Sequence, residues 1–156
     1  MFGKQAHMYQ TTMLIPVLPE RVFPLLCPRR EQEWLDGWRA TILRSKSGFA
    51  ELGCVFLTGD GPSAERCTWI IVEHVPPKRI AFALVEPGLF AEILSVDLEA
   101  VENGTRLHWR REITPLSPEG EATVARRVRE FDKKHAHLAQ SLSHFLKTGQ
   151  RLPAPT

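Results

Sequence analysis

Arg111 and His135 are the two polar side chains whose positions in the sequence best suit chemistry inside a protein. His135 interrupts an apolar stripe on a long predicted helix, and Arg111 stands at an inward position of a predicted strand. A histidine in an apolar pocket favours its neutral form, so it can act as a general base or orient a carbonyl. An inward arginine can bind a carboxylate or enolate oxygen. The pair predicts a pocket for an oxygenated, largely apolar molecule, with both residues as candidate catalytic groups.

The same two side chains have a purely structural alternative. His135 could hydrogen-bond a strand side chain, and Arg111 could pair with a glutamate such as Glu86 or Glu92. Under this alternative both residues stabilise the core and neither contacts a ligand.

Three more polar side chains could reach the same space, namely Tyr9, Thr68 and His74. Alternation places Thr68 and His74 on one face of a strand. Both alternations of that strand are largely apolar, so the face of residues 69–73 that points inward stays open.

Other reactive chemistries lack a signature in this sequence. His135 and His137 lie on opposite faces of a helix and cannot share one ion, and no His-x-x-x-His spacing occurs, so no metal is expected. No G-x-S-x-G motif, P-loop or dinucleotide fingerprint is present, and no cysteine lies near a histidine in the sequence. We therefore expect no cofactor, and we favour a binding protein over an enzyme.

Composition indicates one soluble globular domain. The chain has 156 residues, of which 43% are hydrophobic and 24% charged, enough for a single sizeable core. A net charge of +2, with basic and acidic residues interleaved, gives no indication of a nucleic-acid partner. No apolar run is long enough to span a membrane. We expect one domain over residues 1–149 and a proline-containing tail over residues 150–156.

The number and spacing of the cysteines indicate whether the protein is expected in a reducing or an oxidising cell compartment. Cys27, Cys54 and Cys67 are an odd number without Cys-x-x-Cys spacing, which argues against a disulfide framework or a zinc ribbon. The N-terminal residues lack the apolar core of a signal peptide. We therefore expect a cytoplasmic protein with reduced, partly buried cysteines.

Hydrophobic periodicity and turn residues predict the elements that must hold these side chains. A strand over residues 7–17 precedes short helices over residues 19–26 and 29–36, the first beginning at Pro19 and the second ending at Gly37. Six strands follow, paired with their sequence neighbours and hence antiparallel: 39–45, 50–58, 65–75, 79–86, 89–101 and 105–114.

The final helix, over residues 118–148, has the clearest periodicity. Its inward stripe repeats at alternating spacings of four and three: Val124, Val128, Phe131, His135, Leu138, Leu142 and Phe145. At about 1.5 Å per residue the helix runs roughly 45 Å, long enough to cross a sheet. Basic residues off the stripe are expected in solvent: Arg126, Arg127, Arg129, Lys133 and Lys134.

Alternation along the predicted strands separates an inner from an outer face. The inner set on the last strand is Leu107, Trp109, Arg111 and Ile113. The two preceding strands contribute Ile80, Phe82, Leu84, Leu94, Val96 and Leu98. These faces and the stripe of the final helix would enclose the core.

The segment EWLDGW contains two of the four tryptophans. Trp34 and Trp38 are four residues apart, the spacing of neighbours on a helix. They could stack on a ligand at the rim of a pocket or simply fill the core. Asp36 between them is expected to be exposed and to have no basic partner.

Five short motifs, in order along the chain, are similar to those of one superfamily. They are IPVLPERVFPLL (15–26), EWLDGW (33–38), GFAELGCVF (48–56), IIVEHVPPKRIAF (70–82) and ENGTRLHW (102–109). In the fourth, His74 and Val75 replace the usual Val-Asp. Over about residues 7–148 the chain resembles the SRPBCC superfamily, which includes START domains, plant pathogenesis-related ligand carriers, bacterial polyketide cyclases and the domain that activates the heat-shock chaperone ATPase.

The resemblance implies an α+β helix-grip fold. In that fold a curved antiparallel sheet of about seven strands wraps around a long C-terminal helix, and two short helices follow the first strand. A cavity between sheet and helix would hold a small hydrophobic or amphipathic molecule, lipid or polyketide-like. The candidate ligand-binding residues are Trp34, Trp38, Thr68, His74, Phe82, Leu94, Trp109, Arg111, Phe131, His135 and Leu138.

Three functions stay open, because members of the superfamily share no single active site. The first is a carrier or sensor of the cavity ligand. The second is an enzyme of the polyketide cyclase or dehydratase type, with His135 as general base and Arg111 as oxyanion partner. The third is a chaperone-interacting or other protein-interaction module. An exposed Trp69–Ile71 face would also allow a homodimer.

Overall fold

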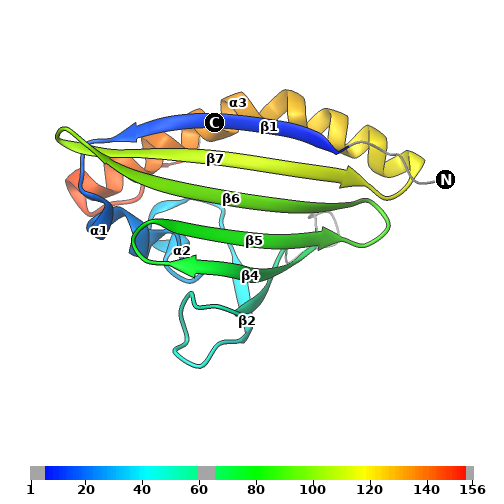
Figure 1. The fold of residues 1–156 in the computed structure, drawn as a ribbon, viewed down its shortest axis with the longest axis horizontal. Coiled ribbons are helices and arrows are strands. Elements are labelled where there is room, and N and C mark those ends of the chain that lie inside the picture. The colour runs from blue at the N-terminus through cyan, green and yellow to red at the C-terminus, as the bar shows by residue number, and fades with distance from the viewer. Residues whose placement is uncertain (1–5, 60–65, 154–156) are drawn as a thin grey trace.

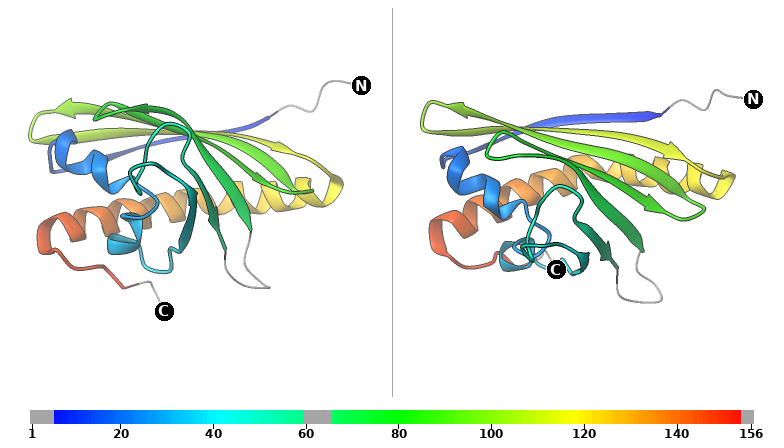
Figure 2. Two further views of the ribbon diagram at one scale, coloured as in Figure 1. Left: turned by 90° about the horizontal axis from the view of Figure 1, so that it is seen from below. Right: turned by 60° about the horizontal axis from the view of Figure 1, so that its bottom comes forward.

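The computed structural model describes residues 6–59 and 66–153 and shows a curved antiparallel sheet with one long helix across one face (Figures 1 and 2). The sheet has seven strands in the order β1-β7-β6-β5-β4-β3-β2. Their bounds are β1 His7–Ile15, β2 Ala40–Arg44, β3 Val55–Thr58, β4 Cys67–Val75, β5 Arg79–Glu86, β6 Phe90–Val101 and β7 Gly104–Pro115. The long helix is α3, Pro118–Thr148. This is the α+β helix-grip arrangement that the order of predicted elements indicated.

The first strand of the chain pairs with the last strand of the sheet. β1 pairs antiparallel with β7, which sets Tyr9 opposite Arg111 and Thr11 opposite Trp109. All other pairs in the sheet join strands that are neighbours in sequence. Directly opposed residues of an antiparallel pair face the same side of the sheet. The β1–β7 pairing therefore brings a tyrosine from the N-terminal strand beside the inward arginine.

Short helices carry the chain from the β1 edge of the sheet to the β2 edge, on the side of the sheet where α3 lies (Figure 2). They are α1 Pro19–Val22, the 3-10 helix η1 Phe23–Leu25 and α2 Glu31–Trp34, all shorter than predicted. Pro24 has no N–H to continue an α-helix, so the first predicted helix tightens into a 3-10 turn. The second stops where Leu35 becomes extended.

The third strand begins five residues later than predicted, at Val55. Residues 45–54 instead form a loop in which the Glu51 carboxylate accepts hydrogen bonds from the backbone N–H groups of Lys46 and Ser47. Hydrogen bonds from Ser47 and Lys46 lower the pKa of Glu51 to about 2. Gly53, with φ of 83°, then turns the chain into the strand.

A bulge in β4 decides which of its residues face the core. Val72 is an extra residue between the paired positions Ile71 and Glu73. Before the bulge, the inner residues are Cys67, Trp69 and Ile71. After it, the alternation is shifted, and His74 contacts the buried ring of Phe23 with a centroid separation of 5.5 Å.

The structure thus decides the inward face of β4, which the sequence left open, and it contradicts the candidate Thr68. Thr68, a candidate cavity residue, is instead exposed on the outer face of the sheet. The expected exposed Trp69–Ile71 face is also absent, because Ile71 is fully buried and Trp69 packs on Phe56. Only the bulge, which no local sequence signal specified, lets His74 share a side with Trp69.

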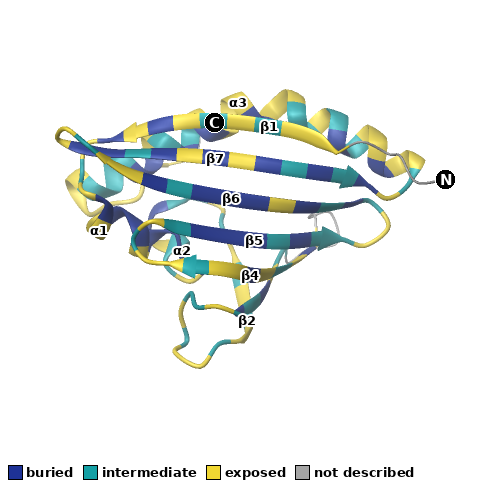
Figure 3. Ribbon diagram, viewed as in Figure 1, coloured by how far each residue is buried: buried dark blue, intermediate teal, exposed yellow. Residues whose placement is uncertain are grey.

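The core lies between α3 and the middle of the sheet. Buried residues run through β5, β6 and β7, as Figure 3 shows. The inner faces predicted for these strands are confirmed: Ile80, Phe82, Leu84, Leu94, Val96, Leu98, Leu107, Trp109, Arg111 and Ile113 are all buried. Cys27, Cys54 and Cys67 are buried too and form no disulfide.

The helix α3 has the bounds that its periodicity predicted. The Ser117 side chain caps its first turn by accepting a hydrogen bond from Gly120 N, and Gly149 ends it with φ of 71°. Most of the predicted stripe is buried: Val124, Phe131, His135, Leu138 and Leu142. No helix within the two described ranges combines the length and apolar character needed to cross a bilayer.

One basic residue of α3 does not behave as predicted. Arg126, Arg129 and Lys133 are exposed as expected. The side chain of Arg127 is only 11% exposed, with its guanidinium 4.6 Å above the Phe90 ring and 3.7 Å from a Glu92 oxygen. Cation–π contact and the nearby carboxylate outweigh solvation of this arginine.

We expect that Gly120→Ala lowers the free energy of unfolding by about 2 kcal/mol. A Cβ at Gly120 would overlap the backbone carbonyl of Leu89, so the first turn of α3 would have to shift. Urea denaturation measures the change. Ala122→Gly, an exposed site in the same turn, is the control and should lose about 1 kcal/mol from helix propensity alone. A stabilised Gly120→Ala protein would contradict the close contact.

Candidate functional site

An internal cavity of about 160 Å³ lies between α2, α3 and the curved sheet. Its walls come from most elements of the fold, because the sheet bends around the helices (Figure 2). The lining residues are Leu26, Glu31, Trp34, Leu35, Trp38, Phe56, Thr58, Cys67, Trp69, Phe82, Leu84, Leu94, Val96, Trp109, Arg111, Arg127, Lys134 and Leu138. The lining is mainly aromatic and aliphatic, with polar groups from α2, β3, β4, β7 and α3.

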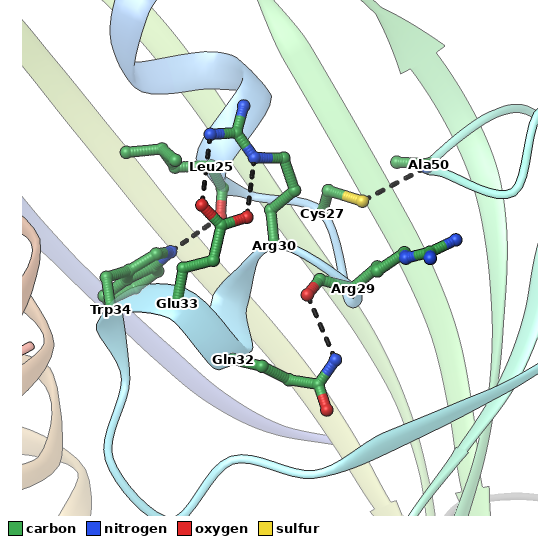
Figure 4. Close-up of polar contacts among 8 residues, drawn as sticks. All are labelled: Leu25, Cys27, Arg29, Arg30, Gln32, Glu33, Trp34 and Ala50. Carbon is green, nitrogen blue, oxygen red and sulfur yellow. Dashed lines mark hydrogen bonds and ion pairs between the residues drawn. The ribbon is translucent and has the colours of Figure 1, made fainter.

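All four tryptophans of the chain line this cavity. Trp34 is 1% exposed and donates its indole N–H to Leu25 O at 2.8 Å (Figure 4). Trp38 donates to Pro28 O at 2.8 Å, and Trp69 to Thr58 Oγ1 at 2.9 Å. The buried Trp109 Nε1 has no acceptor within residues 6–59 and 66–153. The indole N–H groups of Trp34, Trp38 and Trp69 are therefore paired within the protein, and the indole N–H of Trp109 remains available as a hydrogen-bond donor.

Figure 4 shows the polar contacts around Trp34 in the α2 segment. Arg30 and Glu33 form an ion pair at 3.0 Å on its outer side. The backbone N–H of Ala50 donates to Cys27 Sγ at 3.3 Å, which ties the preceding turn to the loop before β3. These contacts present Trp34 and Trp38 to the cavity.

Arg111 is the polar centre of the cavity wall. Its side chain is 5% exposed; Nη1 donates to Glu92 Oε2 at 2.6 Å, and the Glu92 side chain is fully buried. Nε donates to His135 Nε2 at 3.2 Å, and the guanidinium lies 4.6 Å above the Phe131 ring. Burial lowers the pKa of Arg111, and the charge of Glu92 opposes this shift. Both structural alternatives weighed for the sequence thus occur, while Arg111 also faces the cavity.

His135 lies behind the cavity wall rather than on it. It is 3% exposed, stacked on Tyr9 at 5.4 Å and edge-on to Trp109 at 5.1 Å between ring centroids. Burial lowers its pKa to about 3, and the positive charges of Arg111 and Lys134 add to this shift. Because Nε2 accepts a hydrogen bond from Arg111, the proton of the neutral ring belongs on Nδ1.

This arrangement does not suit a general base. The lone pair of Nε2 is occupied by Arg111, and Nδ1 is buried without an acceptor in the part of the chain that the structure describes. A base must be within reach of the proton that it abstracts. His135 instead orients Arg111.

Tyr9 reaches the same cluster from β1. Its hydroxyl donates to Asp132 Oδ1 at 2.6 Å, and its ring packs 4.9 Å from Phe131. Burial and the hydrogen bond to Asp132 raise the pKa of Tyr9 to about 12. Tyr9 therefore stays neutral, and it covers Phe131 and His135 on the side near the β1 edge of the sheet.

Glu31 is a cavity residue that the sequence reasoning missed. It stands in the first turn of α2, three residues before the buried Trp34, and spacing of three places both on one helix face. This spacing was the signal that could have identified it. Burial raises the pKa of the Glu31 carboxyl to about 8, and the charge of Arg111 opposes the rise. The carboxyl is therefore mostly protonated at neutral pH.

The remaining predicted site residues divide into three groups. Phe82, Leu94 and Leu138 line the cavity together with Trp34, Trp38, Trp109 and Arg111. Phe131 and His135 are buried behind it. His74 lies apart, in a separate groove beside Phe23, and Thr68 lies on the outer face. Arg127, predicted as solvated, contributes to the cavity wall, and Lys134, which is exposed as predicted, borders the cavity as well.

Asp36 also differs from its prediction. Its carboxylate lies 3.9 Å from the Nε of Arg151, where no basic partner was expected. Arg151 donates in addition to Gln32 O at 3.1 Å, and Leu152 forms a bridge with Leu35. The chain beyond α3 thus returns to the α2 segment. Within the described ranges, no three His, Cys, Asp or Glu side chains come together as potential metal ligands.

Comparison with known proteins supports the architecture. No family model matches the chain, and no curated protein is similar to it in sequence. Mll3558 from Rhizobium loti is 18% identical, with a TM-score of 0.68 over 89% of this chain and 96% of that one. CalU16 from Micromonospora echinospora is 16% identical, with a TM-score of 0.64 over 88% of this chain and 77% of CalU16.

DynU16, a protein of the dynemicin biosynthetic locus, is a further structural neighbour. It is 16% identical, with a TM-score of 0.67 over 92% of this chain, and this chain spans 48% of DynU16. At such identities the likeness concerns the fold alone. What this chain shares with these proteins is the helix-grip fold.

Proposed function

We propose that this protein binds a small amphipathic molecule in the cavity between the sheet and α3, as a carrier or sensor. The observation that supports the proposal is the cavity itself, which is mainly apolar and carries a few converging polar groups. Its volume is about 160 Å³. An apolar cavity of about 150 Å³ in another protein takes up benzene, so this one suits a single ring or a short chain.

The size of the cavity restricts the ligand further than the resemblance did, which implied a lipid or polyketide-like molecule. A full-length lipid or a polycyclic polyketide would need a larger space, since typical sites for drug-sized ligands measure about 300–1,000 Å³. DynU16, which has a similar fold, is a protein of a biosynthetic locus, and this is consistent with a small-molecule ligand here. We therefore favour a compact molecule with one ring.

The two alternatives receive less support. A cyclase-type or dehydratase-type enzyme with His135 as general base would need an accessible ring nitrogen, and Arg111 occupies Nε2. A protein-interaction module would be favoured by a fully packed interior, and this interior contains a cavity. Ligand binding without chemistry is the function that the geometry supports best.

We expect that filling the cavity removes ligand binding. Val96→Phe combined with Leu138→Phe places two extra rings in it, because both side chains line the wall. The assay is quenching of tryptophan fluorescence by toluene and p-cresol, since all four tryptophans border the site. Native mass spectrometry of the purified protein tests for a ligand bound in the cell.

Ile70→Phe is the matched control for this experiment. It adds the same ring on the outer face of β4, where Ile70 is 39% exposed. The control should bind like the original protein, and the filled variant should show at least a tenfold loss. If neither small compound changes the fluorescence of the original protein and no ligand is found bound to it, the proposed function is wrong.

A further inference from the structure

Two of the polar groups that line the cavity lie on different walls, Glu31 on α2 and Arg111 on β7. The positive charge of Arg111 acts on the Glu31 carboxyl, so the two groups are electrostatic neighbours. The wall also carries aromatic and aliphatic side chains, among them all four tryptophans. A ligand in this space meets an acid and a guanidinium at once.

Arg111 retains hydrogen-bonding capacity toward the cavity. Two of its five N–H donors are engaged, one by Glu92 and one by His135. No acceptor for Nη2 occurs within residues 6–59 and 66–153, and the residue lines the cavity. The planar guanidinium is suited to carboxylate oxygens. His135, which is neutral, adds no charge that would repel an anion.

Glu31 does not act as the counter-ion of Arg111 at neutral pH. Its carboxyl loses solvation in the cavity, and burial holds its pKa at about 8. A protonated carboxyl donates one hydrogen bond. An anionic oxygen placed between Glu31 and Arg111 would therefore receive hydrogen bonds from both sides.

A third donor belongs to the same cavity. Trp109 is 8% exposed, and its Nε1 is buried without an acceptor among the described residues. A buried polar group without a partner costs roughly 1–3 kcal/mol. A ligand with acceptor oxygens would offset this cost, whereas a hydrocarbon would not.

We propose that the cavity binds a small aromatic carboxylic acid as its anion, with the carboxylate between Arg111 and Glu31 and the ring among the tryptophans. This inference rests on the proposed function and adds the charge and chemical class of the ligand. The wall has no room for more than about one ring beside the carboxylate. Trp34, Trp38 and Trp69 supply flat apolar surfaces for that ring.

The proposal makes binding depend on pH in a definite direction. Below pH 8 Glu31 is protonated and donates to the bound carboxylate; above pH 8 it is ionised and repels it. Other titratable or charged groups near Glu31 are Arg111 on β7, Arg127 and Lys134 on α3, and the Cys67 thiol on β4. Arg151 lies on the outer side of α2. The three cationic groups of the wall favour an anion throughout this range.

The first experiment compares benzoate with benzamide, its neutral counterpart of nearly the same shape, by calorimetry at pH 7. We expect benzoate to bind at least tenfold more tightly. If toluene and benzamide bind and benzoate binds no better than benzamide, this inference is overturned and the proposed function stands. If none of the three binds, the proposed function is overturned as well.

The second experiment follows benzoate binding from pH 7 to pH 9. With a pKa near 8 the protonated fraction of Glu31 falls about tenfold, and benzoate affinity should fall with it. At pH 8 binding should take up about half a proton per benzoate, measured in buffers of different ionisation enthalpy. Glu31→Gln keeps a donor and cannot ionise, so its affinity should stay constant.

Two control variants test whether the pH dependence of benzoate binding comes from Glu31. Glu33→Gln, on the outer side of the same helix, should retain the pH dependence of the original protein. Cys67→Ser removes the cavity thiol from the titration and should retain it too. A Glu31→Gln protein whose benzoate affinity still falls tenfold would overturn the role of Glu31.

Arg111 is tested through a double replacement, because a single one would leave the buried Glu92 without its closest partner. Arg111→Met with Glu92→Met exchanges the ion pair for apolar side chains of similar length, a change that proteins often tolerate. Its circular dichroism and binding of toluene show that it folds. The preference for benzoate over benzamide should shrink to about twofold or less. A preference that stays tenfold would overturn the assignment of Arg111.

Discussion

Glu92→Gln should lower the free energy of unfolding by about 3–5 kcal/mol, the range for breaking a buried ion pair at one partner. The Glu92 side chain is fully buried, 2.6 Å from Arg111 Nη1 and 3.7 Å from Arg127 Nη2. Without the carboxylate, the buried guanidinium of Arg111 loses its counter-charge. Urea denaturation at pH 7 measures the loss.

Glu99→Gln on the same strand is the matched control. Glu99 pairs with Arg106 at 3.5 Å and with His108 at 3.3 Å, but its side chain is 57% exposed. Solvent screens such pairs, so the control should lose less than about 1 kcal/mol. Equal losses in the two variants would show that Glu92 is not the buried centre of the charge cluster.

His135 should make the protein unstable in mild acid. Its folded-state pKa of about 3 lies below the ordinary value of 6.5, so the unfolded chain binds the proton more readily. Stability from this residue is fully present above pH 6.5 and is lost as pH falls toward 3. Between pH 7 and pH 4 the loss amounts to about 3 kcal/mol.

The measurement is urea denaturation at several pH values for the original protein and for His135→Gln. Glutamine can still accept from Arg111 but does not titrate, so its curve between pH 7 and pH 4 should be flatter by about 3 kcal/mol. Leu142→Ala is the control, since Leu142 is 1% exposed on the same helix. It should lower stability at every pH and leave the slope intact. Parallel curves for all three proteins would mean that His135 has the same pKa in the folded and the unfolded chain.

Arg111 and His135 show which features the pattern within a single strand or helix could predict. Alternation in β7 placed Arg111 inside, and the spacing of four and three in α3 placed His135 on the buried stripe. Both inferences need only one element at a time, because each strand or helix presents one face to the core. The bounds of α3 and the inner faces of β5, β6 and β7 followed from the same reasoning.

The sequence-based predictions failed for residues whose surroundings are contributed by several helices and strands. The bulge at Val72 reverses the alternation of β4, so the side of Thr68 could not be read from its neighbours in sequence. Arg127 looked solvated on a helical wheel, yet Phe90 and Glu92 of β6 draw it inward. Such contacts depend on where β6 lies relative to α3.

From the sequence alone, periodicity determined the apolar inner faces and two buried polar residues, because periodicity within an element reports which side is buried, and the resemblance to the SRPBCC superfamily implied the α+β helix-grip fold. Only the tertiary structure decided what those residues do. Pairing of β1 with β7 and the curl of the sheet set Arg111 against Glu92 and His135, and brought Glu31 to the same cavity. Charge and protonation depend on distances across the fold, which no local pattern encodes.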